Sequence, residues 1–196
     1  MVNRSHEAER GDRYAIELAG LTIRNDKRRD RAREYAVQEV NLRVPMNGRT
    51  MIYGLPGSGK TVIKQALLTP NAYPGMVCVN AVLRELGLKD SRDWATTDYE
   101  RQYTRLISLG DFVVTDEPYD QAFEFLLNLQ NGMLVFAGAD GYEFINRFDL
   151  VAYLENGEIR FSGGPQNFWR WVKEKGSQQL RDYLPRYLVE SGGDSD

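Results

Sequence analysis

The chain has 196 residues, of which 42% are hydrophobic and 27% charged, and its net charge at pH 7 is −3. This composition predicts one globular domain with a sizeable core, and the slight negative charge argues against nucleic acid as a partner. The single cysteine, Cys78, excludes an internal disulfide and favours a reducing compartment such as the cytoplasm. No stretch reaches the roughly 18 apolar residues of a membrane span, so we expect no direct membrane insertion.

Three segments divide the chain. Residues 1–12 are polar and predict a flexible leader, and residues 13–189 predict the single folded domain. Residues 190–196 are small, polar and acidic, which predicts a disordered tail.

The domain begins with two predicted strands. Apolar and polar residues alternate over residues 14–24 and 35–44, which is typical of strands with one buried face. The intervening residues 27–33 are basic but are interrupted by Asp30. We favour a solvated hairpin loop there, although contact with a polyanion such as lipid headgroups, nucleic acid or a polyanionic substrate stays open.

The most specific motif follows an apolar run at residues 50–53. Residues 54–61 match the pattern G-x-x-x-x-G-K-[ST] of a phosphate-binding loop, which predicts a site for ATP and Mg²⁺. Lys60 is expected to reach the β- and γ-phosphates, and Thr61 to bind Mg²⁺. A glycine-rich turn that matches by chance is the alternative. The candidate binding residues are Gly54, Leu55, Pro56, Gly57, Ser58, Gly59, Lys60, Thr61 and Val62.

Downstream, short apolar segments alternate with helix-compatible ones. This pattern predicts an α/β fold with a mostly parallel sheet. The expected strands are residues 50–53, 76–79, 112–115, 133–137 and 150–154, and a hairpin at Asn156-Gly157 leads to a strand at 159–161. The expected helices are residues 62–68, 79–86, 99–108, 120–129 and a stretch that starts at Pro165.

Paired carboxylates end the strand at residues 112–115. Ligands of α/β sheets bind at the carboxyl ends of strands, so Asp116 is a candidate for holding Mg²⁺. Glu117 is a candidate for polarising the attacking water, and with Lys60 it would form the catalytic set. An ordinary strand-to-turn junction with acids facing solvent is the alternative.

Together these motifs resemble an ABC-type ATPase, the nucleotide-binding subunit of ATP-driven transporters. The similarity runs from about Tyr14 to Trp171, and spacing around residues 35–40 and 110–112 looks most like the ATPases of capsular-polysaccharide exporters. It implies a phosphate-loop fold of ABC type, with an N-terminal antiparallel β part and a reduced helical arm. It also implies that Tyr35 stacks on the adenine ring.

The chain departs from that family in three places. Only about 55 residues separate the phosphate loop from the carboxylates, and no Ser-Gly-Gly signature lies between them. No histidine follows residues 133–137, where the family carries its switch histidine. Hydrolysis is therefore expected to be slow or to need a partner.

Two functions from different classes stay open. The first is an ATPase subunit that powers a membrane exporter, with a permease or another ATPase subunit as partner and a homo- or heterodimer on ATP binding. The second is a nucleotide-switched regulatory or assembly subunit with little turnover. A small-molecule kinase is a weaker third. In the first case the protein would be cytoplasmic and peripheral to the membrane.

The aromatic residues 168–171 predict either core packing or a docking surface.

Overall fold

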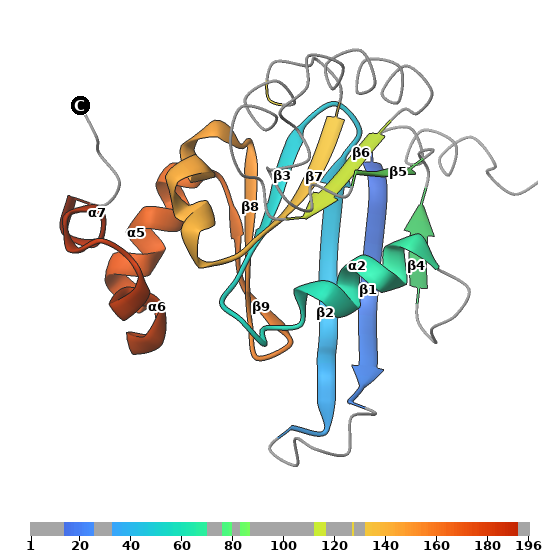
Figure 1. Cartoon of the computed structure of the whole chain (residues 1–196), viewed down its shortest axis with the longest axis horizontal. Coiled ribbons are helices and arrows are strands. Elements are labelled where there is room, and N and C mark those ends of the chain that lie inside the picture. Colours follow the sequence, from blue (N-terminus) through green and yellow to red (C-terminus); the bar gives the residue numbers. More distant parts are fainter. Residues whose placement is uncertain are drawn as a thin grey trace, which may run out of the picture.

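The computed structural model of the chain describes residues 14–25, 33–69, 76–79, 83–86, 112–116, 127 and 132–191 (Figure 1). The strands form a three-stranded sheet of order β2-β1-β4 and a six-stranded sheet of order β5-β6-β7-β3-β8-β9. The six-stranded sheet is parallel except for its last pair, and the other sheet is antiparallel. The predicted α/β class is confirmed, with a mostly parallel central sheet and an N-terminal antiparallel part.

The antiparallel sheet consists of β1 (Tyr14–Arg24), β2 (Tyr35–Pro45) and β4 (Met76–Val79). Strand β1 lies in the middle and pairs antiparallel with both neighbours. The prediction of a strand at 76–79 is confirmed, but its place in the parallel sheet is wrong. A short apolar run does not specify its partner strand, which is decided by the tertiary fold.

The six-stranded sheet places β3 (Arg49–Tyr53) between β7 (Gly132–Ala137) and β8 (Leu150–Glu155). The flanking strands are β5 (Leu83–Leu86) and β6 (Phe112–Asp116) on one side and β9 (Glu158–Gly163) on the other. All of the predicted strands are present.

The expected helix at residues 79–86 is wrong, because residues 83–86 form β5. Strand β5 pairs in parallel with β6, from Leu83 opposite Phe112 to Leu86 opposite Thr115. The leucine spacing of this segment suits a helix, but ladder hydrogen bonds to the neighbouring strand override such weak local preference.

Five helical segments are described: α2 (Lys60–Leu68), the 3₁₀ segment η3 (Ala139–Arg147), α5 (Pro165–Lys175), α6 (Gln178–Tyr183) and α7 (Arg186–Ser191). The helix expected after the phosphate loop is confirmed, and the C-terminal helical stretch divides into three. The segment η3 was not predicted. Helix α7 ends at Ser191, two residues beyond the domain boundary expected at 189. The expected helices at 99–108 and 120–129 lie outside the described residues, apart from Leu127.

The central sheet separates two cores, because successive side chains of each strand point to opposite faces. In β3, Met51 and Tyr53 pack against the C-terminal helices, whereas Ile52 packs on the side of β1, β2 and α2. The aromatic residues Phe168 and Trp169 of α5 are 0% and 1% exposed, so this part of the stretch 168–171 is core. Among the described residues, no helix has the length and hydrophobicity to cross a membrane.

Candidate functional site: the phosphate-loop cleft

The predicted phosphate loop connects β3 in the centre of the sheet to helix α2. It begins where the parallel strands end, and the Gly54 amide donates a hydrogen bond to the Ala137 carbonyl of β7 at 3.1 Å. The loop therefore lies at the carboxyl edge of the sheet, the place where α/β sheets bind ligands.

The three glycines of the loop are required for two different reasons. Gly57 and Gly59 have φ angles of 77° and 109°, which other residues rarely adopt. Gly54 does not have a positive φ, but a β-carbon there would lie 2.5 Å from the Leu154 carbonyl oxygen. Backbone conformation therefore requires glycine at positions 57 and 59, and close packing against β8 requires it at position 54.

Helix α2 begins directly at the loop, with Gly59 as its N-cap and no side chain capping it. The amides of Val62 and Ile63 bond to the Gly59 carbonyl at 3.0 and 3.1 Å. Amides at the start of a helix and its dipole favour an anion, and no side chain caps them in this helix. The local geometry therefore fits a phosphate group.

The ammonium group of Lys60 is bonded to atoms of the phosphate loop itself. It donates to the carbonyls of Gly54 and Leu55, the latter at 3.2 Å, and to Ser58 Oγ at 3.5 Å. A cation held inside the loop by its carbonyls is placed to meet an anion bound by the loop amides.

The tip of the β8–β9 hairpin supports the loop from outside. The Gly157 amide donates to the Ser58 carbonyl at 2.8 Å, and the Gly157 carbonyl accepts from the Gln38 amide of β2 at 2.9 Å. Asn156 and Gly157 have φ angles of 57° and 85°, the left-handed pair that a tight Asn-Gly turn requires. Figure 1 shows this tip beside the segment that precedes α2. The hairpin thus joins the loop to β2.

A cleft of about 520 Å³ lies over the loop, a size that suits a small ligand. Its described lining comes from three places: the loop with α2, the start of β2, and the ends of the β1–β2 hairpin. The lining residues are Asn25, Arg33, Tyr35, Ala36, Pro56, Gly57, Ser58, Gly59, Lys60, Thr61 and Val62. Tyr35 and the loop, predicted separately, therefore lie in one cleft, whereas Gly54 and Leu55 are buried and do not line it.

Arg33 was expected in a solvated hairpin loop, and the structure shows it exposed in the β1–β2 connection, with one contact that the sequence did not predict. Its Nη1 donates to the Gly57 carbonyl at 3.3 Å, so the side chain reaches across to the phosphate loop. Residues 27–32, the rest of that basic segment, lie outside the described residues. The spacing in the sequence could have predicted that Arg33 lies near the nucleotide site. Arg33 precedes Tyr35 by two residues, and residues two apart in an extended chain point to the same face.

The predicted metal ligand Asp116 ends β6, two strands away from β3. Asp116 is in register with Phe136 of β7, and Phe136 is in register with Ile52 of β3. Neighbouring strands lie about 4.8 Å apart, which places the Asp116 backbone about 10 Å from β3, at the edge where the loop begins. Glu117 lies outside the described residues.

Below the loop, Tyr53 ends β3 and donates from its hydroxyl to the Ala139 carbonyl at 3.0 Å. Burial, together with the nearby Tyr153 and acidic groups, raises the pKa of Tyr53 well above its usual value. Burial also raises the pKa of Tyr153, and the nearby Glu155 carboxylate raises it further. Both phenols therefore stay neutral to a higher pH than a free tyrosine, and both donate hydrogen bonds, Tyr53 to the Ala139 carbonyl and Tyr153 to the Glu155 carboxylate.

Comparison with known proteins extends this description. No protein-family model and no curated protein sequence matches the chain. Among solved structures, cbiO1 from Clostridium perfringens, part of the ABC transporter complex cbiONQ, superposes with a TM-score of 0.62 at 13% identity, covering 91% of this chain and 99% of that one.

A bacterial Atm1-family ABC exporter with ATP bound superposes with a TM-score of 0.60, also at 13% identity. The alignment covers 85% of this chain but only 43% of the exporter chain. At such low identity the likeness concerns the fold. The chain therefore has the α/β fold of ABC-type ATPases, as the sequence predicted.

Proposed function

We propose that this protein is an ATP·Mg²⁺-binding ABC-type ATPase subunit that couples ATP binding and hydrolysis to a membrane exporter. The observation that carries the proposal is the convergence in one cleft of the phosphate loop, the start of α2, Lys60 and Tyr35. The fold of the two ABC transporter proteins described above supports it.

In this proposal different residues bind the phosphates, the base, the metal ion and the attacking water. The loop amides and Lys60 hold the β- and γ-phosphates, and Tyr35 stacks on the adenine ring. Thr61 and Asp116 would hold Mg²⁺, whose charge neutralises the phosphates during transfer. Glu117 would accept the proton of the attacking water.

The proposed partners are a membrane permease and a second ATPase subunit, identical or not. Dimer formation on ATP binding is part of the proposal, and light scattering with and without Mg-ATP measures it. Polysaccharide is a proposed cargo that rests on the spacing around residues 35–40 and 110–112 alone. Polymer export by cells that lack the protein tests it.

A nucleotide-switched subunit with little turnover is the second candidate. After β7, where ABC ATPases place a switch histidine, the chain continues into η3 without a histidine. The absence of Ser-Gly-Gly between the phosphate loop and the carboxylates also favours a subunit with little ATP turnover. Nucleotide binding with no turnover, even with partner subunits, would favour this candidate over the first.

The deciding measurement combines calorimetric Mg-ATP binding with phosphate release. Lys60→Ala is expected to abolish both, because it removes the cation inside the loop. Glu117→Gln is expected to retain binding and lose hydrolysis. Lys64→Ala, one turn further along α2 and outside the cleft lining, is the matched control and should behave as wild type. Equal binding by the wild type and Lys60→Ala would contradict the proposal.

A further inference from the structure

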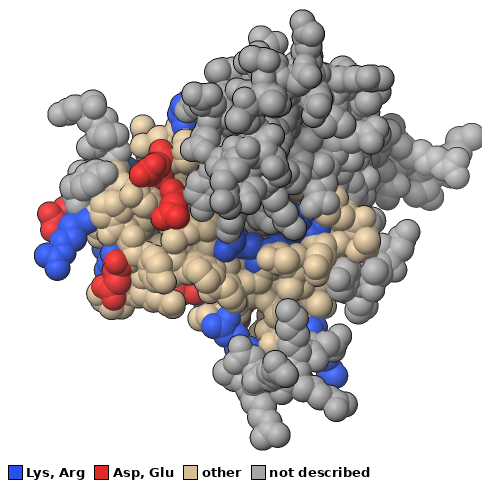
Figure 2. All heavy atoms as spheres, in the orientation of Figure 1, with Lys and Arg blue, Asp and Glu red and all other residues tan. Residues whose placement is uncertain are grey.

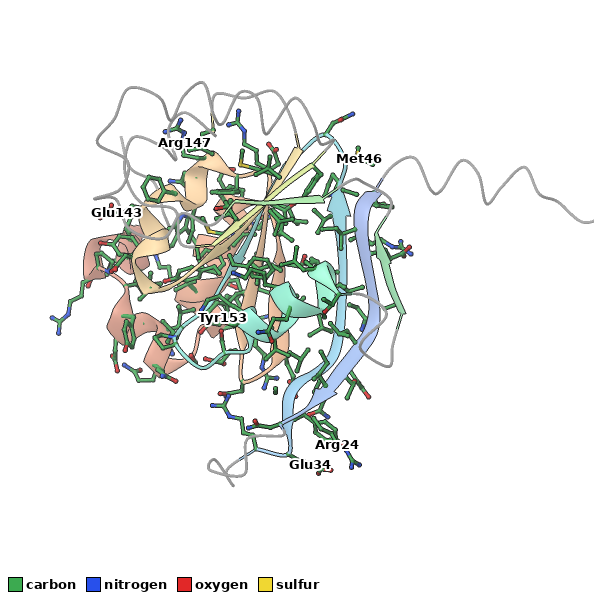
Figure 3. All side chains as sticks on the ribbon, turned by 45° about the vertical axis from the view of Figure 1, so that its right-hand side comes forward. Arg24, Glu34, Met46, Glu143, Arg147 and Tyr153 are labelled. Atoms are coloured by element: carbon green, nitrogen blue, oxygen red, sulfur yellow. The ribbon has the colours of Figure 1, made fainter. Side chains whose placement is uncertain are left out.

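Arg33 is a cation of the cleft to which no role has yet been given. It lies immediately before the β1–β2 pairing, which extends beyond the strands: the Asn25 amide donates to the Glu34 carbonyl at 2.9 Å. Arg24 and Glu34, labelled in Figure 3, form an ion pair at 3.9 Å at the same end of the hairpin. An ion pair this exposed contributes little, so the Asn25–Glu34 backbone hydrogen bond is what holds the backbone next to Arg33 at the mouth of the cleft.

The side chain of Arg33 is directed into the cleft. Its hydrogen bond to the Gly57 carbonyl brings the guanidinium to the outer rim of the phosphate loop, while Lys60 bonds to carbonyls further inside. The two cations thus reach the same loop from different parts of the chain, Arg33 from the residues just before β2 and Lys60 from the start of α2.

The charges around the cleft favour an anion. Of its described lining residues, Arg33 and Lys60 are positively charged and none is acidic. In Figure 2, the visible acidic side chains lie on the left-hand side, whereas basic side chains occur there and also across the middle and toward the lower edge. A polyanion entering beside Tyr35 would therefore pass Arg33 before it reaches Lys60.

The guanidinium group of Arg33 is itself well suited to binding phosphate. A guanidinium carries five N–H donors in a planar fork that suits phosphate oxygens. Among the described residues, Arg33 makes one hydrogen bond, to the Gly57 carbonyl, and no ion pair. No described residue occupies its remaining donors, which lie at the rim of the loop, where a bound polyphosphate chain would lie.

We propose that Arg33 is a second phosphate-binding cation, which contacts the polyphosphate chain of the nucleotide from the side of β2. The inference rests on the proposed nucleotide site and adds to it a source of selectivity. Arg33 would favour nucleotides with a polyphosphate over nucleosides, whereas Tyr35 contacts only the base.

The test compares four proteins by calorimetry: wild type, Arg33→Ala, Arg33→Lys and Arg24→Ala. The ligands are Mg-ATP, magnesium tripolyphosphate and adenosine. Arg24 lies at the same end of the hairpin, its side chain is 74% exposed, and it does not line the cleft. Arg24→Ala therefore controls for loss of a nearby positive charge.

Arg33→Ala is expected to weaken Mg-ATP and tripolyphosphate binding at least tenfold, because it removes charge-assisted hydrogen bonds. Adenosine binding should change less than twofold. Arg33→Lys should recover part of the loss, since it restores charge without the fork. The salt dependence of Mg-ATP binding should become weaker in Arg33→Ala.

Three results would overturn the inference. Mg-ATP affinity within twofold of wild type in Arg33→Ala would refute it and leave the nucleotide site intact. An equal loss of ATP and adenosine binding would show that Arg33 only supports the loop through Gly57. Absence of Mg-ATP binding in the wild type would refute the proposed function together with this inference.

Discussion

At the scale of single residues, the phosphate loop shows that one residue type can satisfy different constraints. Gly57 and Gly59 are needed for positive φ angles, but Gly54 is needed because strand β8 passes close to it. The motif identifies all three positions. The close approach of Leu154 involves a strand about 100 residues away in sequence, so only the folded structure reveals it.

Thr50 of β3 is a buried polar residue without a hydrogen-bond partner among the described residues. It is 0% exposed, and its hydroxyl oxygen lies within the core. Thr50→Val is expected to stabilise the protein by about 1 kcal/mol, because it removes an unsatisfied buried hydroxyl. Urea unfolding measures the change.

The matched control for this change is Thr22→Val. The Thr22 hydroxyl donates to the Gly20 carbonyl at 3.2 Å and accepts from the Glu39 amide at 3.0 Å. Its loss should destabilise the protein by about 1 kcal/mol. An unfolding midpoint for Thr50→Val at or below that of the wild type would mean that the hydroxyl finds a partner in solution.

At the scale of elements, short apolar runs predicted the strands of the central sheet, because strands such as β3, β7 and β8 have side chains in both cores. Alternation predicted β1 and β2. The same reasoning failed at residues 83–86, where helix-compatible spacing occurs in a strand. The segment η3 was not predicted, although it is amphipathic, with Ile145 buried and Glu143 and Arg147 exposed. The placement of β4 beside β1 also depended on the tertiary fold, since pairing partners are remote in sequence.

The hairpin tip at Gly157 is expected to act on the loop as well as on stability. A β-carbon at Gly157 would lie 2.8 Å from the Ala36 carbonyl oxygen, next to Tyr35. Gly157→Ala therefore adds a steric clash to the left-handed strain of about 1–2 kcal/mol. We expect lower stability and at least fivefold weaker Mg-ATP binding, measured by thermal unfolding and calorimetry.

Gly20→Ala separates the two effects. Gly20 has a φ of 63°, but a β-carbon there would meet no atom within 4 Å. This variant should lose stability through backbone strain alone and bind Mg-ATP as the wild type does. Equal nucleotide affinity in Gly157→Ala and Gly20→Ala would show that the hairpin tip does not position the loop.

At the scale of the whole molecule, the site joins segments that are distant in the chain. The cleft is lined by the ends of the β1–β2 hairpin and by the phosphate loop, and the β8–β9 tip bonds to both β2 and the loop. Ligand binding at such a junction should stabilise the whole fold rather than one element.

Saturating Mg-ATP is therefore expected to raise the melting temperature. A ligand at 100 times its Kd adds about 2.7 kcal/mol, which corresponds to a shift of about 5–10 °C for a domain of this size. Differential scanning fluorimetry measures the shift, and Lys60→Ala should abolish it. An equal shift in that variant would place the ligand outside the phosphate loop.

The sequence by itself determined the local features: the phosphate loop, most strands, helix α2 and the tight turn at Asn156-Gly157. These depend on residue types and short spacings, which act within a few residues of chain. The partners of β4 and β5, the packing reason for Gly54 and the position of Arg33 were decided only by the tertiary structure. They depend on contacts between distant segments, and those contacts form only when the strands assemble into sheets.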